Sequence, residues 1–422
     1  MSPSAGAALS AHTLGKVTLS FAVFAATYFL SALLRAVTAT LAPEFSAEFG
    51  LSAAELGLLA GAYFLGFAAL QLPLGTALDR WGPRRTEVLL VLLAVVGCAL
   101  FALARNFTQM VAARMLIGMG VSACLMAPLT YFRRHLPDAL QLRMNSWMLM
   151  TGSLGMLAST VPVQWTLPVL GWRGLFGLLS VLLAVAVVAL MFGMQRDGAV
   201  AQDGRAAAQD MRYADILSHP VFVRLAPMGF VLYGGLIAVQ ALWAGPWMTQ
   251  VNGWSAASAG LGLLMINAAM LVAFFSWGIV MPTLVRVGID AHCLLRWGVP
   301  AGLIQLALIA WIGAGAAATA WTLWCVATSV LAVTQPLVGQ AFPVRMAGRA
   351  LSAFNLVIFG GIFVLQWGIG AVIDLLQRAG LGPVDAFRSA MALLALLGLA
   401  SYLWYLMPRG RGAHNVAAEN PS

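Results

Sequence analysis

Apolar runs of about twenty residues recur along the whole chain and leave little between them that could face water. A helix needs about 20 such residues to cross the roughly 30 Å hydrocarbon layer of a bilayer. Of the 422 residues, 61% are hydrophobic and only 9% are charged, whereas soluble domains carry roughly 25% charged residues. The chain is therefore predicted to be an all-α membrane protein.

Twelve runs of this kind predict twelve transmembrane helices, which we number as spans 1 to 12. They cover residues 17–41, 54–76, 87–104, 108–131, 144–167, 174–194, 221–247, 256–280, 292–314, 317–340, 350–375 and 386–407. The interval 195–220 mixes both charge signs with Gly and Ala and predicts a linker. The expected organisation is a tail (1–16), a six-helix bundle (17–194), this linker (195–220), a second six-helix bundle (221–407) and a second tail (408–422).

The basic residues predict the orientation of these spans in the membrane. Outer loops would hold few of the 23 basic residues, namely Arg105, Arg173, Arg378 and Arg388, whereas most others lie on the side of the termini. Loops rich in arginine and lysine stay in the cytoplasm. Both termini are therefore expected in the cytoplasm, with the spans in a bacterial inner membrane. The same asymmetry accounts for the sequence pI near 10.0 without a nucleic-acid partner.

The two bundles are predicted to be pseudo-symmetric. The segment GLSAAELGLL at 50–59 aligns with GWSAASAGLGLL at 253–264, so that Ser52 and Gly57 recur as Ser255 and Gly260. A repeat with an even number of spans keeps its orientation in the membrane. This arrangement is typical of alternating-access transporters, which bind their substrate between the halves near the midplane.

A loop motif follows span 2 in the segment PLGTALDRWGPRRTEV. Its pattern is Gly75-x-x-x-Asp79-Arg80-x-Gly82-x-Arg84-Arg85. The motif resembles the loop signature of the major facilitator superfamily, and Arg114-x-x-x-Gly118-x-Gly120 resembles a second one. The resemblance implies a fold of two six-helix bundles and a conformational latch made by Gly75, Asp79, Arg80, Gly82, Arg84 and Arg85. Glycine is expected at Gly75 and Gly82 because the backbone turns or helices touch there.

The same resemblance implies that spans 1, 4, 7 and 10 line a central pathway. Polar and aromatic residues share single faces of these helices and of span 11, as expected for a water-lined wall or for contacts between helices. The candidate substrate-binding residues are Thr27, Ser31, Arg35, Thr38, Arg114, Tyr233, Gln240, Trp243, Gln335, Asn355 and Gln366.

Arg35 is the strongest candidate, because it interrupts the apolar run TYFLSALLRAVTATLA. It lies nine residues before Glu44 and therefore about 13 Å from that end of the span. Side chains in a helix lean toward its N-terminus, so Arg35 should lean into the membrane. No Asp, Glu or His is expected at mid-span. The carboxylates near the spans lie at the cytoplasmic side (Asp79, Glu87, Asp138) or near the outer ends (Glu44, Glu48, Glu55, Asp374). An anionic substrate would then supply the missing charge, and proton coupling would have to be indirect. Arg114 is expected either to contact the substrate or to hold helices together.

These patterns predict a secondary transporter, acting as a monomer, that moves a small anionic solute by rocker-switch alternating access, in uptake or symport with a proton or cation. The alternative is a proton-coupled exporter of amphiphilic compounds, which the aromatic residues Trp243, Trp247 and Trp321 would favour.

An enzyme is not expected, because no histidine within a span could activate Ser153 as a nucleophile. The four scattered cysteines predict no metal site, and no cofactor is expected.

Overall fold

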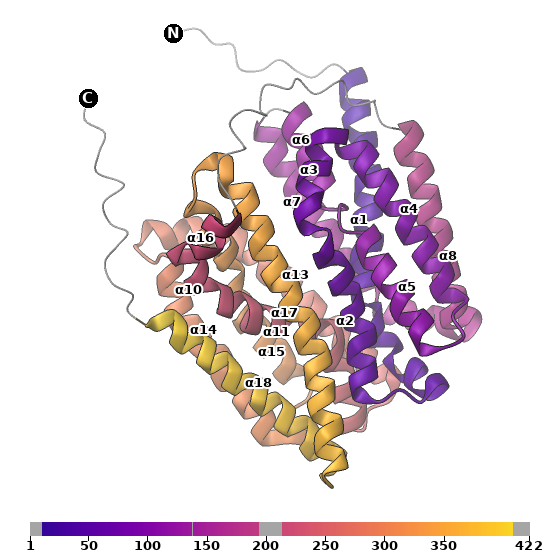
Figure 1. Cartoon of the computed structure of the whole chain (residues 1–422), viewed down its shortest axis with the longest axis vertical. Coiled ribbons are helices and arrows are strands. Elements are labelled where there is room, and N and C mark those ends of the chain that lie inside the picture. The colour runs from indigo at the N-terminus through magenta and orange to yellow at the C-terminus, as the bar shows by residue number, and fades with distance from the viewer. Residues whose placement is uncertain (1–10, 137, 194–212, 408–422) are drawn as a thin grey trace.

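The computed structural model describes residues 11–136, 138–193 and 213–407, which form helices joined by short turns and contain no strand (Figure 1). The first half of the chain comprises α1 (Ala11–Phe49), α2 (Ala53–Ala69), α3 (Gln71–Trp81), α4 (Pro83–Ala102), α5 (Phe107–Gly120), α6 (Met126–His135), α7 (Asp138–Ala158) and α8 (Val161–Gly193). Helix α1 begins at Ala11, within the predicted tail 1–16, and the part of it that is apolar enough to cross a membrane is Val17–Phe49.

The second half begins with α9 (Tyr213–Ser218), which lies inside the predicted linker 195–220. The linker residues up to 212 and the predicted tail 408–422 lie outside the described part of the chain. The further helices are α10 (Pro220–Met228), α11 (Gly234–Ala238), α12 (Ala244–Pro246), α13 (Ala256–Arg286), α14 (Ala291–Ile312), α15 (Ala318–Thr328), α16 (Thr334–Gln340), α17 (Val344–Arg378) and α18 (Pro383–Leu406).

The prediction of an all-helical membrane protein is confirmed. Within the described residues, nine helices are long and apolar enough to cross a membrane, or ten if α2 and α3, bent by 46°, form one span. The two further predicted spans correspond to the interrupted pair α5 and α6, and to α7 with the start of α8. Gly171, with φ 60°, breaks α8 where the sequence predicts the turn between spans 5 and 6. The pattern is consistent with twelve spans.

Helix irregularities are concentrated in three of the four helices expected to line the pathway. Span 7 contains three π-helical turns, at Gly229–Tyr233, Val239–Trp243 and Trp247–Val251. Span 10 contains a 3₁₀ turn at Ser329–Val333, and span 4 is interrupted between α5 and α6. π-Turns are rare and frequently occur at functional sites.

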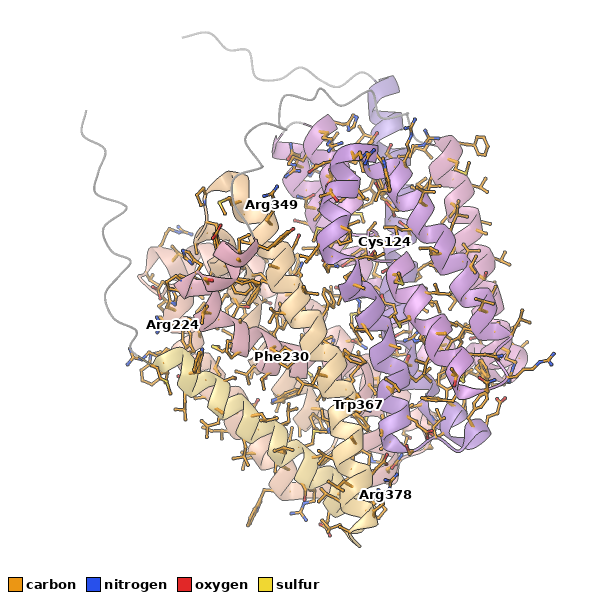
Figure 2. The ribbon with its side chains drawn as sticks, in the orientation of Figure 1. Cys124, Arg224, Phe230, Arg349, Trp367 and Arg378 are labelled. Atoms are coloured by element: carbon orange, nitrogen blue, oxygen red, sulfur yellow. The ribbon has the colours of Figure 1, made fainter. Side chains whose placement is uncertain are left out.

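The two halves lie side by side, with α2 against α17 (Figure 1). We call the end of the bundle that carries the α1–α2 and α17–α18 turns the distal face, and the opposite end the terminal face. Figure 2 shows α17 running from Arg349 near the terminal face to Arg378 at the distal face. Glycines allow this approach: a Cβ on Gly57 would lie 2.2 Å from the Gln366 carbonyl oxygen, and one on Gly370 2.1 Å from that of Ala53.

Glycines of the second motif bring helices together within the first half. A Cβ on Gly118 would lie 1.9 Å from the Tyr63 carbonyl oxygen of α2, and one on Gly120 would lie 2.2 Å from the Ala94 nitrogen of α4. Small residues of this kind let membrane helices pack backbone to backbone. The motif thus holds α5 against the two helices beside it.

Gly118→Ala should therefore destabilise the protein. The new methyl group has no space, and overpacking costs about 1–3 kcal/mol. Gly177→Ala in α8 is the matched control, since a Cβ there meets nothing within 4 Å and gains helix propensity. Thermal unfolding of both purified variants in detergent checks this expectation. Equal melting temperatures for the two variants would contradict the close packing at Gly118.

Candidate functional site

Arg35 lies beside tyrosines from both halves of the molecule. The phenol groups of Tyr28 in α1 and Tyr63 in α2 lie next to its guanidinium, and Tyr233 in span 7 is close enough to interact with it electrostatically. The Arg35 Nε is buried without a hydrogen-bond partner, while the residue as a whole is partly exposed. In the described residues, no Asp or Glu carboxylate lies within 4.0 Å of it. Arg35 is therefore a cation without a counter-ion at the boundary between the halves.

Ser31 lies one helical turn before Arg35 and belongs to the same environment. Its backbone carbonyl accepts a hydrogen bond of 3.3 Å from the Tyr63 hydroxyl. Its own Oγ is buried without a partner. Buried hydroxyl groups nearly always have a hydrogen-bond partner, so Ser31 leaves hydrogen-bonding capacity unused beside the guanidinium.

Arg114 is only 1% exposed and is bonded to span 1. Its NH1 donates to the Leu34 carbonyl at 3.0 Å, its NH2 donates to the Thr38 hydroxyl, and its guanidinium lies 5.3 Å from the centre of the Tyr63 ring. Of the two roles expected for Arg114, these contacts support positioning of the helix that carries Arg35. Thr38 is likewise engaged in this contact.

Glu87 is a functional candidate that the sequence analysis missed. The carboxyl is 0% exposed, its Oε1 lies 2.5 Å from the Thr27 hydroxyl oxygen, and its Oε2 is enclosed without a partner. Glu87 was expected only at the cytoplasmic end of its span, and its complete burial was not expected. The reason is that α4 begins at Pro83, which places Glu87 in the second turn of the helix. A proline at the first position of a helix is a common start signal, and it could have revealed this placement.

The predicted residues of the second half are joined to one another. The hydrogen bonds run from Gln240 Nε2 to Asn267 Oδ1 (2.9 Å), from Trp243 Nε1 to the Gln366 carbonyl (3.1 Å) and from Gln335 Nε2 to Asn355 Oδ1 (3.1 Å). Both polar side-chain atoms of Gln366 are buried without a partner. In the part of the chain that the structure describes, no hydrogen bond joins these residues to Arg35, so their contact with a substrate stays a prediction.

The loop motif makes contacts within the first half. Asp79 forms an ion pair of 3.3 Å with Arg134 at the end of α6, and the Arg84 Nε donates to the Leu190 carbonyl at 3.0 Å. Gly82 has φ 79°, as expected of a glycine turn. The helix contact expected at Gly75 is absent from the described residues, since a Cβ there would meet nothing within 4 Å. Arg80 and Arg85 are exposed. The latch role of the motif stays a prediction.

At the distal face, hydrogen bonds join the two halves. The carboxylate of Asp374 in α17 accepts the N–H groups of Ala53 (3.0 Å) and Ala54 (2.8 Å) in the first turn of α2. We call this arrangement the distal clasp. The side-chain amide of Gln164 also donates to the Ala256 carbonyl across the halves. A carboxylate at a helix N-terminus satisfies free N–H groups and interacts favourably with the helix dipole. Opening the distal face requires breaking these bonds.

A small apolar pocket lies within the second half, between spans 7, 9, 10 and 12. Leu232, Leu303, Trp324 and Leu394 are among its lining residues, and none of the lining residues is charged. It therefore offers nothing to pair with an anion, and the unpaired polar groups around Arg35 define the candidate site.

Two halves of membrane-spanning helices around buried polar side chains define a membrane transport protein. The sequence profile of the Major Facilitator Superfamily matches residues 24–365, and the chain belongs to this superfamily. The resemblance noted from the motifs is thereby confirmed, and so is the expectation that the protein is a transporter rather than an enzyme.

Individual relatives match shorter segments. The chain is 32% identical over 145 residues to the probable L-galactonate transporter of Escherichia coli, which covers 33% of this chain and 31% of that protein. It is 28% identical over 163 residues to the 4-hydroxybenzoate transporter PcaK of Pseudomonas aeruginosa, covering 38% and 36%. The chain thus matches about a third of the length of these relatives.

Among solved structures, the D-xylose-proton symporter has a TM-score of 0.73 at 16% identity, covering 92% of this chain and 97% of that one, which shows the shared fold.

Asp374→Asn should shift the protein toward a state that is open at the distal face. The amide keeps the shape of the side chain but loses its charge and one acceptor, which should cost the clasp about 1–2 kcal/mol, a roughly five- to thirtyfold change in population. Electron paramagnetic resonance distances between spin labels at Arg105→Cys and Leu381→Cys, in a Cys293→Ser background, would measure it. Asp385→Asn is the control, because Asp385 pairs with Arg388 of its own half. An unchanged distance distribution in Asp374→Asn would contradict the gating role.

Proposed function

We propose that the protein carries a small anionic solute across the membrane by alternating access between the two halves, in uptake or symport. The observation that supports this proposal is the position of Arg35. It is a cation inside a membrane helix, beside Tyr63 of its own half and Tyr233 of the other, with no carboxylate of the described residues within 4.0 Å.

The argument rests on the cost of an unpaired charge. Removing a charged group from water is costly unless an opposite charge and hydrogen bonds compensate for it. Charged residues within membrane spans commonly mark substrate or ion pathways. Arginine presents a planar set of donors that matches a carboxylate or another planar oxyanion. An anion bound here would neutralise Arg35, and the hydroxyls of Ser31 and the nearby tyrosines would offer further hydrogen bonds.

The names of several relatives agree with an anionic substrate. They include transporters of L-galactonate, 4-hydroxybenzoate, cis,cis-muconate and nitrate or nitrite. One relative is instead named as a facilitated glucose transporter, so the uncharged class is a necessary comparison. The charge of Arg35 is the reason for preferring the anion for this chain.

We assign the remaining features to the same cycle. The terminal face, with Arg80, Arg84 and Arg85, is placed in the cytoplasm of a bacterial inner membrane by the positive-inside rule. The loop motif and the distal clasp would act at opposite ends of the molecule. A single chain contains both halves and the site between them, which supports a monomeric transporter.

The alternative, export of amphiphilic compounds, receives less support from the aromatic residues. Trp243 and Trp247 are 1% and 0% exposed, and each donates its indole N–H to a backbone carbonyl. Trp247 and Trp321 pack edge to face with ring centres 5.2 Å apart. Fully enclosed and hydrogen-bonded rings of this kind hold helices together and offer no surface to a drug.

Arg35→Gln should weaken anion transport. Loss of a charge-assisted interaction costs about 1.5–3 kcal/mol, which corresponds to a roughly ten- to hundredfold rise in KM. Arg35→Lys keeps the charge but loses the planar donor set, so an intermediate effect is expected. Initial uptake into proteoliposomes would be measured with L-galactonate, 4-hydroxybenzoate and nitrate, and with D-glucose as the uncharged comparison.

Arg105→Gln is the matched control, because it removes an exposed arginine from the distal face. Its transport should equal that of the unmodified protein. Full transport of an anion by Arg35→Gln, or transport of D-glucose alone by the unmodified protein, would overturn the proposed anion site.

A further inference from the structure

The buried carboxyl of Glu87 makes contacts that depend on whether it carries a proton. Glu87 lies in α4 and Thr27 lies in α1, and both side chains are 0% exposed. In the described residues, this contact is the hydrogen bond that links the two helices. It connects Glu87 to the same helix that carries Arg35 eight residues further on, about 12 Å along the axis.

The hydrogen atoms at this contact can be accounted for. The Thr27 hydroxyl oxygen lies 2.8 Å from the Phe24 carbonyl oxygen and 2.5 Å from Glu87 Oε1, and both atoms accept hydrogen bonds. A hydroxyl has one hydrogen to donate. Both contacts are therefore satisfied together only when the Glu87 carboxyl is protonated and donates to Thr27, which then donates to Phe24.

No positively charged side chain of the described residues pairs with the Glu87 carboxyl. The other oxygen, Oε2, is enclosed without a partner, and no arginine of the described residues lies within 4.0 Å. Cys124, in the turn between α5 and α6, lies close enough to Glu87 to interact with it electrostatically. Four arginines on α4 and on the elements packed against it bond elsewhere: Arg134 with Asp79, Arg114 with Leu34 and Thr38, Arg173 with Glu48, and Arg84 with Leu190 and Met191. The others on α3, α4 and α6 are exposed, namely Arg80, Arg85 and Arg133.

We infer that Glu87 is the proton-binding site of the carrier and that one proton crosses with each negative charge bound at Arg35. The coupling half of this inference rests on the proposed function, whereas the proton site stands on its own contacts. On release, only the O–H bond of the Glu87 carboxyl breaks. Its proton passes to water, and the electron pair stays on the carboxylate.

Charge balance explains why proton and anion would move together. Cys124 lies close enough to both Glu87 and Arg35 to interact with each electrostatically, and Figure 2 shows Cys124 nearer the terminal face than Trp367. With anion and proton both bound, the Arg35 charge is cancelled and Glu87 is neutral. With neither bound, Glu87 is an anion and Arg35 a cation that do not pair directly, and their charges sum to zero. Either half-loaded form carries a net charge, and burying an uncompensated charge is costly.

The proton site can be tested without knowing the substrate. Infrared difference spectra of the purified protein, recorded during a pH titration, should contain a protonated carboxyl band that Glu87→Gln abolishes. Glu44→Gln, which removes a carboxylate of α1 near the distal face, is the control and should leave the band intact. Thr27→Val removes the hydrogen-bond partner and should shift the frequency of the band, and this measurement remains decisive even if Glu87→Gln does not fold. A spectrum that neither variant changes would overturn the proton site.

The coupling is tested with 4-hydroxybenzoate and nitrate in proteoliposomes. One proton per monovalent anion supports up to about tenfold accumulation for each imposed pH unit, because tenfold corresponds to 1.4 kcal/mol. This accumulation should not depend on an imposed membrane potential. Glu87→Gln should lower it to roughly onefold and still exchange internal for external anion, a combination that simple misfolding would not produce.

The outcomes separate the two proposals. At anion concentrations below the raised KM, Arg35→Gln should slow both uptake and exchange by roughly ten- to hundredfold. A Glu87-dependent infrared band without transport of any anion would leave the proton site standing and overturn the proposed function. Anion uptake that ignores the pH gradient in the unmodified protein would overturn the coupling alone.

Discussion

The cost of placing charge inside an apolar bundle governs the organisation of the first half. Arg114 meets that cost by donating to Leu34 and Thr38, so its charge serves to join α5 to α1. In the described residues the Nε of Arg35 has no hydrogen-bond partner, and its side chain remains partly exposed beside tyrosines of both halves. The two arginines therefore differ in their surroundings, since Arg114 is bonded to α1 and Arg35 keeps an unpaired donor.

Close backbone contacts hold helices together within the first half, whereas few hydrogen bonds join one half to the other. Gly118 and Gly120 bring α5 against α2 and α4, so the helices around Arg114 and Tyr63 have little freedom to shift. The contact of α2 with α17 also uses glycines. Among the described residues, the hydrogen bonds between the halves are those of the distal clasp and the bond from Gln164 in α8 to Ala256 in α13. A few hydrogen bonds at one end are easier to exchange than a continuous polar seam, as a rocking motion requires. The π-turns of span 7 place irregular backbone beside this boundary.

Much of the fold follows from hydropathy, because a span must be both long and apolar. Arg35 is identifiable for the same reason, since one charge within such a run is conspicuous. Glu87 is not, because hydropathy defines where a run begins only to within a turn, and one turn decides whether a carboxyl is buried. The distal clasp also escapes prediction, since Asp374 and Ala53 come together only through tertiary packing. The backbone turn that the motif predicts at Gly82 is present. At Gly75, the predicted contact between helices is absent from the described residues.

The two halves contribute different kinds of chemical group to the distal clasp. On the second half it depends on one side chain, Asp374. On the first half it depends on the backbone N–H groups of Ala53 and Ala54, which every residue except proline supplies. The first half can therefore vary the side chain at position 54 without altering the clasp, and the side-chain part of the clasp is set from the second half alone. The distal clasp, as distinct from the Gln164 bond beside it, could be tuned through a single position.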